Sequence, residues 1–104
     1  MQVWCSPSLE FTLFSFYIFV MEITIEINPS AYDHGITELS IRQAIMNPVY
    51  NDVLDEFADK YLLLGFDNNG KLLEIVYNDI DERSINVFHA MRCRKCYYHL
   101  LPGN

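Results

Sequence analysis

Basic residues are scarce in this sequence. Its 104 residues include 7 lysines and arginines against 14 aspartates and glutamates, which gives a formal net charge of −7. Strong, sequence-independent binders of nucleic acid usually carry an excess of positive charge, so this balance argues against that class. The length leaves room for one domain with one modest core. The hydrophobic content of 51% is that of a globular chain rather than a disordered one.

Cysteine is also rare, and the three cysteines do not suggest a disulfide framework. Cys93 and Cys96 lie close together in the sequence, and Cys5 has no obvious partner. An odd number of cysteines favours a protein of the reducing cytoplasm. A Cys-x-x-Cys pair is half of a structural zinc site, which His89 and His99 would have to complete. We favour the simpler alternative, in which both cysteines pack as small hydrophobic residues on one face of a helix. We therefore expect no metal and no cofactor.

The sequence lacks a glycine-rich phosphate loop, a nucleophile elbow and a long apolar run. The mostly apolar run from Phe11 to Val20 is too short to span a membrane as a helix, which takes about 20 residues. No lysine or arginine precedes it and no small-residue cleavage site follows, so it does not resemble a signal peptide. Residues 1–20 are either a genuine apolar extension, buried or held at a membrane surface, or translated upstream sequence with Met21 as the natural start. We expect residues 21–104 to form a single domain without a membrane partner.

Hydrophobic periodicity predicts an α+β fold. Residues 22–27 alternate polar and apolar side chains, as a half-buried strand does. Thr37 is a candidate N-cap for a helix over residues 37–46, and Pro48 ends that helix. Asp-Asn-Asn-Gly at residues 67–70 is a hairpin turn between two strong strands. The further expected elements are a short strand or irregular edge at 49–54, strands at 60–66 and 71–77, a polar turn at 78–83, a strand at 84–91 and a helix at 92–101. The resulting order is strand, helix, three-stranded antiparallel meander and helix.

Side chains able to do chemistry gather where the last predicted strand ends. The segment from Ser84 onward contains no acid, although acids are dense at residues 52–59. Histidine exchanges protons near neutral pH, and arginine offers a two-pronged donor for phosphate. An RNA-cleaving enzyme needs a base for the 2′-hydroxyl, cations for the phosphorane and an acid for the leaving oxygen. We predict catalytic roles for His89, Arg92 and Arg94, and RNA binding by Lys95, Tyr97 and Tyr98.

A structural alternative applies to each of these residues. The basic residues of a C-terminal helix often form a solvated face, and His34 before Gly35 is able to serve only as a hydrogen-bonding group in the turn. Arg92 would lie at the beginning of the predicted helix, where the helix dipole disfavours a cation. That position favours a functional role for Arg92.

Several short motifs occur in an order typical of one protein family. They are Asp33-His34-Gly35-Ile36, a helix, Asn47-Pro48, Leu64-Gly65-Phe66-Asp67, Gly70-Lys71-Leu72-Leu73-Glu74-Ile75 and His89-Ala90-Met91-x-x-Arg94. Over about residues 22–101 this pattern resembles the BrnT-like toxins of bacterial type II toxin–antitoxin modules. The resemblance implies a RelE-like fold, ribonuclease activity without a required metal, and neutralisation by a BrnA-like antitoxin that also binds DNA. It also implies catalytic roles for His34 and Arg94 and, through weaker matches, for His89 and Arg92.

The end of the last predicted strand departs from the commoner form of the family. Many BrnT toxins have Ser-Ala-Arg there, whereas this chain has His89-Ala90-Met91. Arg92 or Arg94 would have to replace the missing arginine. Two hypotheses follow: a ribonuclease toxin, in which the four predicted catalytic residues meet in one cleft, or a catalytically degenerate module that binds only its antitoxin, in which they point apart.

Overall fold

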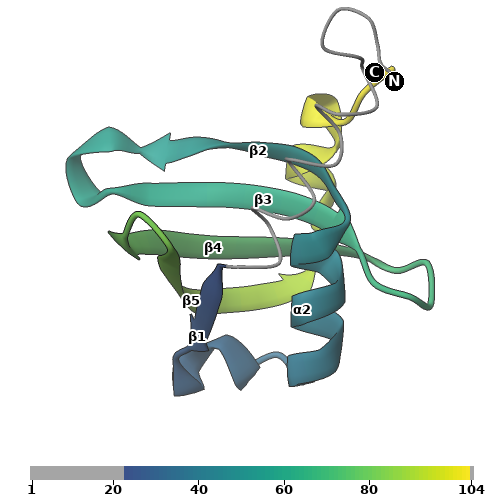
Figure 1. Ribbon diagram of the computed structural model, residues 1–104. Coiled ribbons are helices and arrows are strands. Elements are labelled where there is room, and N and C mark those ends of the chain that lie inside the picture. Colours follow the sequence, from purple (N-terminus) through teal and green to yellow (C-terminus); the bar gives the residue numbers. More distant parts are fainter. Residues whose placement is uncertain (1–22, 104) are drawn as a thin grey trace, which may run out of the picture.

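The computed structural model describes residues 23–103, so the apolar extension at 1–20 and the alternative start Met21 lie outside the described residues. The elements are β1 (Thr24–Ile27), η1 (Pro29–Tyr32), α2 (Glu38–Met46), β2 (Pro48–Asp55), η2 (Glu56–Ala58), β3 (Lys60–Phe66), β4 (Leu72–Asp81), β5 (Ser84–Arg92) and η3 (Lys95–Leu100). Figure 1 shows one sheet with α2 packed across it. Within this part of the chain, no helix has the length and apolar character needed to cross a membrane.

The sheet has five strands in the order β1-β5-β4-β3-β2. Strands β2 to β5 form an antiparallel meander, and β1 pairs with β5 in parallel from Thr24–Ser84 to Ile27–Val87. The predicted α+β fold class is confirmed, but the meander has four strands instead of three. The additional strand is β2, whose side chains are mostly exposed. An edge strand with so little buried surface has a weak hydrophobic pattern, which is why its extent was not predicted.

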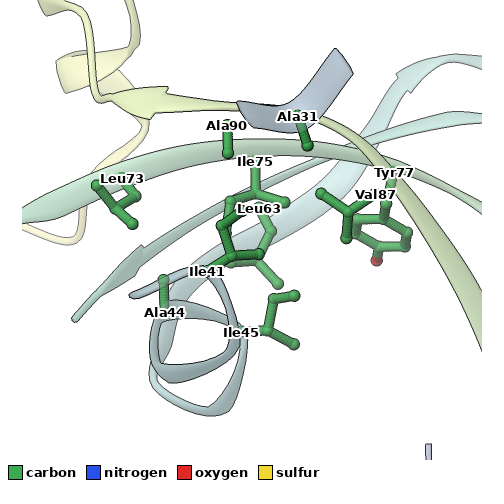
Figure 2. Close-up of a cluster of buried hydrophobic side chains, with 10 residues drawn as sticks. All are labelled: Ala31, Ile41, Ala44, Ile45, Leu63, Leu73, Ile75, Tyr77, Val87 and Ala90. Atoms are coloured by element: carbon green, nitrogen blue, oxygen red, sulfur yellow. The ribbon is translucent and has the colours of Figure 1, made fainter. Parts of the chain in front are cut away.

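Helix α2 is the predicted helix, and its start is fixed by Thr37. The Thr37 hydroxyl oxygen accepts the Ser40 backbone N–H at 3.1 Å, which satisfies one of the unpaired donors at the helix start. The helix directs Ile41, Ala44 and Ile45 onto the sheet, where they meet Leu63 and other buried side chains (Figure 2). This cluster is the main core. Its remaining buried members are Ala31, Leu73, Ile75, Tyr77, Val87 and Ala90.

The opposite face of the sheet carries a smaller apolar cluster. Leu62, Leu64 and Val76 are buried there, and Tyr97 and Leu100 from η3 pack against them. Alternate residues of a strand point to opposite faces, so Leu62 and Leu64 lie on one side and Leu63 lies on the other. Both ends of the described part of the chain therefore contact the sheet, β1 at an edge and η3 on a face.

Two predicted elements are wrong in extent or type. The expected polar turn at 78–83 is mostly strand, because Asn78 and Asp79 continue the β4–β5 ladder opposite Asn86 and Ile85. The Asn86 side-chain amide donates to the Asn78 side-chain oxygen at 3.2 Å, so polar side chains pair across this exposed ladder.

The expected α-helix at 92–101 is the short 3-10 helix η3, and Arg92 is the last residue of β5. The argument from a cation at a helix start therefore does not apply to Arg92. Cys93 precedes η3, so Cys93 and Cys96 do not share a helix face as expected. Burial is the main cause that raises the pKa of the Cys93 thiol, and the negative charge of Glu74 adds to it.

Gly65 fixes how closely α2 approaches the sheet. A Cβ atom at this position would collide with the backbone carbonyl oxygen of Ala44. We expect Gly65→Ala to lower the free energy of unfolding by about 1–3 kcal/mol, as overpacking does. Gly70→Ala is the comparison, because φ at Gly70 is +77° but the space around it is open; its cost from backbone strain is about 1 kcal/mol. Urea denaturation of both variants checks the order, and a smaller loss for Gly65→Ala would contradict the close approach.

Candidate functional site

The side chain of Glu74 is fully buried in the sheet and carries a charge. It lies in β4, and its side-chain exposure is 0%. Arg94 donates to it from three groups: the backbone N–H at 2.9 Å, Nε at 3.1 Å to both oxygens and Nη2 at 2.7 Å. His89 Nε2 forms a further hydrogen bond to Oε2 at 2.9 Å. We call Glu74, His89, Arg94 and His34 the Glu74 cluster.

The strand register explains why these residues meet. Glu74 pairs with Met91, and Val76 pairs with His89 one row further along. The β4–β5 register shifts between Val76 and Tyr77, which leaves Phe88 as an extra residue in β5 and turns His89 toward the face that bears Glu74. Beyond β5, the Cys93 N–H donates to the Leu72 carbonyl at 2.9 Å, which brings the Arg94 backbone to the end of Glu74.

The charges of the Glu74 cluster fix a protonation pattern. Burial acts to raise the pKa of Glu74, but hydrogen bonds from the Arg94 side chain and backbone, and then from His89, outweigh it and lower the pKa. The carboxylate is therefore ionised at neutral pH and only accepts hydrogen bonds. Because it has no proton to give, its bond to His89 requires a proton on Nε2. Neutral His89 then has its lone pair on Nδ1 and is able to act as a base there.

His34 reaches the Glu74 cluster from the other end of the chain. Its ring centroid lies 5.4 Å from that of His89, with an angle of 75° between the ring planes. His34 follows η1, and the Ser30 hydroxyl of η1 donates to the Phe88 carbonyl at 2.7 Å. The β1–β5 pairing ends at Val87, so η1 and His34 pack where a longer β1 would continue. This arrangement places two histidines together at the edge of the sheet.

A cavity opens beside His89 and Arg94. It has a volume of about 340 Å³, and its remaining lining residues are Leu54, Lys60, Val76, Phe88 and Tyr97. The Arg94 guanidinium carbon lies 5.6 Å from the centre of the Tyr97 ring, a cation–π contact. The cavity thus presents one lysine, one arginine and two aromatic rings next to the pair of histidines. Such a surface offers both charge and stacking to a nucleotide.

The structure brings together some of the predicted site residues and separates others. His34, His89 and Arg94 form the Glu74 cluster, and Tyr97 lies beside it. Arg92 does not join them, because it pairs with Leu73 on the α2 face of the sheet and lines a different cavity. Lys95 and Tyr98 are exposed on η3. Of the four residues expected in a single cleft, His89 and Arg94 line one cavity, His34 contacts His89 beside it, and Arg92 lies elsewhere.

Two residues of the site were missed by the sequence analysis, Glu74 and Lys60. Glu74 had a visible signal, because it is the one charged residue in the apolar run Leu72 to Val76. Glutamate is seldom fully buried unless it is paired, so its presence there indicates a buried partner. Lys60 had none, because a lysine at the first position of a strand has no pattern that marks it as part of a site. Within residues 23–103, no group of three or more histidine, cysteine, aspartate and glutamate side chains is arranged to hold a metal ion.

The chain was compared with known protein families, curated proteins and solved structures. No protein-family model matches this chain, and no curated protein matches it. Among solved structures, the chain is similar to the crystal structure of the ribonuclease toxin BrnT from Brucella abortus, at a TM-score of 0.47 and 12% sequence identity, over 70% of this chain and 99% of that one.

The buried charge predicts unequal losses of stability. Glu74→Gln keeps the shape and loses the charge, and we expect about 2 kcal/mol of destabilisation from the weakened hydrogen bonds. Arg94→Ala should destabilise more, because it leaves a buried carboxylate without its main partner. Glu38→Gln is a matched control, since it breaks an exposed pair with Arg42 that is worth at most about 0.5 kcal/mol. Urea denaturation at neutral pH ranks the three variants, and equal losses at Glu38 and Glu74 would contradict the central role of Glu74.

The same cluster predicts a dependence on pH. The pKa of Glu74 is lower in the folded chain than its ordinary value, so ionised Glu74 stabilises the fold above the ordinary value of about 4.3. This contribution is lost as the pH falls through the folded pKa. The difference in stability between the wild type and Glu74→Gln should therefore be full at neutral pH and shrink below about pH 4.3. Denaturation series at several pH values measure it, and a difference that grows on acidification would contradict the assignment.

Proposed function

We propose that this protein is a ribonuclease of the toxin type, which cleaves RNA by proton transfer through His89 and His34. The observation that carries the proposal is the edge-to-face pair of histidines, 5.4 Å apart, one of which is held by a buried carboxylate. A buried glutamate that accepts from a histidine fixes the tautomer and the orientation of that ring. A solvated surface histidine would have no such support.

The chemistry follows from the protonation pattern. Nδ1 of His89 removes the proton from a ribose 2′-hydroxyl, and the 2′-oxygen attacks the adjacent phosphorus. A P–O2′ bond forms, the P–O5′ bond breaks, and protonated His34 gives its proton to the leaving 5′-oxygen. The products are a 2′,3′-cyclic phosphate and a 5′-hydroxyl end. RNA supplies its own nucleophile, so the protein contributes a base, an acid and stabilising charge.

Arg94 and Lys60 are the cations available to the phosphorane at this site. The Arg94 side chain is 52% exposed although it binds Glu74, so its guanidinium still faces the cavity side. Glu74 balances part of its charge, and Lys60 adds a positive charge that is not shared in this way. The net charge of −7 opposes contact with the RNA backbone. We therefore expect RNA binding that is modest in affinity and sensitive to salt.

A partner that silences such a ribonuclease would have to cover the cavity beside His89. Leu54, Phe88 and Tyr97 line it, and Leu54 is 43% exposed, so the covering surface should be apolar with acidic groups near Lys60. A cognate antitoxin of the BrnA-like, DNA-binding kind is the partner we propose for residues 21–104, acting in the cytoplasm.

A cleavage assay with defined RNA tests the proposal. Purified wild-type protein should produce 2′,3′-cyclic phosphate ends, and His89→Gln and His34→Gln should each lower the rate by about 100-fold or more. His99→Gln is the matched control, because His99 is an exposed histidine at the end of η3 outside the Glu74 cluster. Circular dichroism confirms that each variant is folded. The rate should follow a bell-shaped pH profile that is lost in the two active-site variants.

The alternative is a catalytically degenerate module that binds only an antitoxin. Two results together would support the antitoxin-binding module and overturn the ribonuclease proposal. Folded wild-type protein would leave RNA intact over the whole pH range, and its expression would not slow growth. Cleavage that His99→Gln abolishes as strongly as His89→Gln would also overturn the assignment of the site.

A further inference from the structure

A second cavity carries two cations on the α2 face of the sheet. Arg92 and Lys71 line it, and its volume is about 480 Å³. Within residues 23–103 neither side chain forms a hydrogen bond or an ion pair with another described residue. The charge of Lys71 acts on the nearby Asp67 carboxylate, whereas the Arg92 side chain has no such partner in the described part of the chain. Cations beside a concave surface are a usual means by which proteins bind phosphate groups.

The other side chains that line this cavity determine its net charge, and the net charge determines which ligand it can bind. Asp67 also lines it, and the backbone N–H groups of Asn69 and Lys71 both donate to its Oδ1 at 2.9 Å. The Lys71 N–H is the main cause that lowers the pKa of Asp67, so this carboxylate is ionised. Two cations and one anion leave one net positive charge. A phosphodiester carries one negative charge, so it matches this balance better than a doubly charged phosphate end.

The cavity adjoins the Glu74 cluster across the edge of the sheet. Gly35 and Ile36, which directly follow His34, are among its lining residues. Arg92 lies three residues after His89 on β5, about 10 Å along a strand, and points to the opposite face. The β1–β5 pairing ends at Val87 and η1 packs beside β5 at Phe88, so no strand of the described chain extends the part of this edge that leads from His89 to Arg92. The separation is comparable with the spacing of one or two successive phosphates on a single strand.

We propose that Arg92 and Lys71 bind the phosphodiester next to the one that is cleaved, so that a single RNA strand crosses the edge of β5. The scissile phosphate then lies by His34 and His89, and its neighbour lies in the second cavity. This inference rests on the proposed ribonuclease function. It gives Arg92 a role in binding, where the sequence analysis predicted a role in catalysis, and it adds Lys71, which the sequence analysis did not select.

Binding of a 2′-O-methyl RNA hexamer, which has no 2′-hydroxyl and is not cleaved, tests this subsite. We expect the Lys71→Gln/Arg92→Gln double variant to raise the Kd at low salt by about tenfold or more. The slope of log Kd against log salt should fall by about 0.7, the value for one phosphate contact on a single strand. Arg83→Gln is the control, because it removes a positive charge at the β4–β5 turn, nine residues before Arg92. Fluorescence anisotropy at four salt concentrations gives both quantities.

Inorganic phosphate distinguishes an RNA subsite from a site for a free anion. The RNA subsite would be overturned if inorganic phosphate changes the NMR amide shifts of Ser40 and Asn69 while the double variant binds the hexamer as tightly as the wild type does. Equal weakening of hexamer binding by Arg83→Gln and by Arg92→Gln would overturn it as well, because the effect would then be one of overall charge.

Cleavage kinetics separate this inference from the proposed function. In an active enzyme, the double variant should raise KM by more than it changes kcat, whereas the loss of a catalytic group would lower kcat. If the wild type does not cleave RNA but binds the hexamer with the predicted dependence on Arg92 and Lys71, the proposed ribonuclease function is wrong and the proposed binding site is supported. If the wild type cleaves RNA and the double variant has the same KM, the proposed binding site is wrong and the proposed ribonuclease function is supported.

Discussion

A carboxylate in the interior of the sheet is the constraint on which the rest of this structure depends. Glu74 is fully buried, and taking its charge out of water costs several kcal/mol unless donors replace the lost hydration. Arg94 supplies four of the contacts and His89 supplies another. These partners come from β5 and from the segment after it, so the need to satisfy one oxygen pair holds the C-terminal part of the chain against the sheet. The orientation of His89 is a by-product of this requirement.

This dependence explains why the site and the stability of the fold are hard to separate. A replacement at Glu74 or Arg94 disturbs both the packing of η3 and the ring that is proposed to move protons. His34 differs in this respect, because it is exposed and lies outside the buried hydrogen-bond network. Replacing each histidine therefore gives different information. If replacing His34 abolishes activity, unfolding is a less plausible cause than it is for a residue of the buried network.

The local parts of the fold could be predicted from sequence, whereas its long-range pairings could not. The cap at Thr37, the hairpin turn at residues 67–70 and the strand that starts at Ser84 depend on neighbouring residues, and the structure has all three. The parallel pairing of β1 with β5 joins residues about sixty positions apart, and no local signal indicates it. No local signal in the sequence indicates the bulge at Phe88 either, yet it decides that Val87 and His89 face opposite sides of the sheet. The predicted group of four therefore gave three members of one site and one member of another cavity.

The parallel pairing of β1 with β5 also bears on when the site exists during synthesis. His34 leaves the ribosome well before His89 and Arg94, which lie 55 or more residues further along the chain. Until those residues emerge, β1 has no strand to pair with, and Glu74 has neither of its partners. Domains rich in contacts between distant residues fold late and slowly. The cluster is thus assembled only after β5 and Arg94 have been made, so a nascent chain that stops short of them lacks the paired histidines.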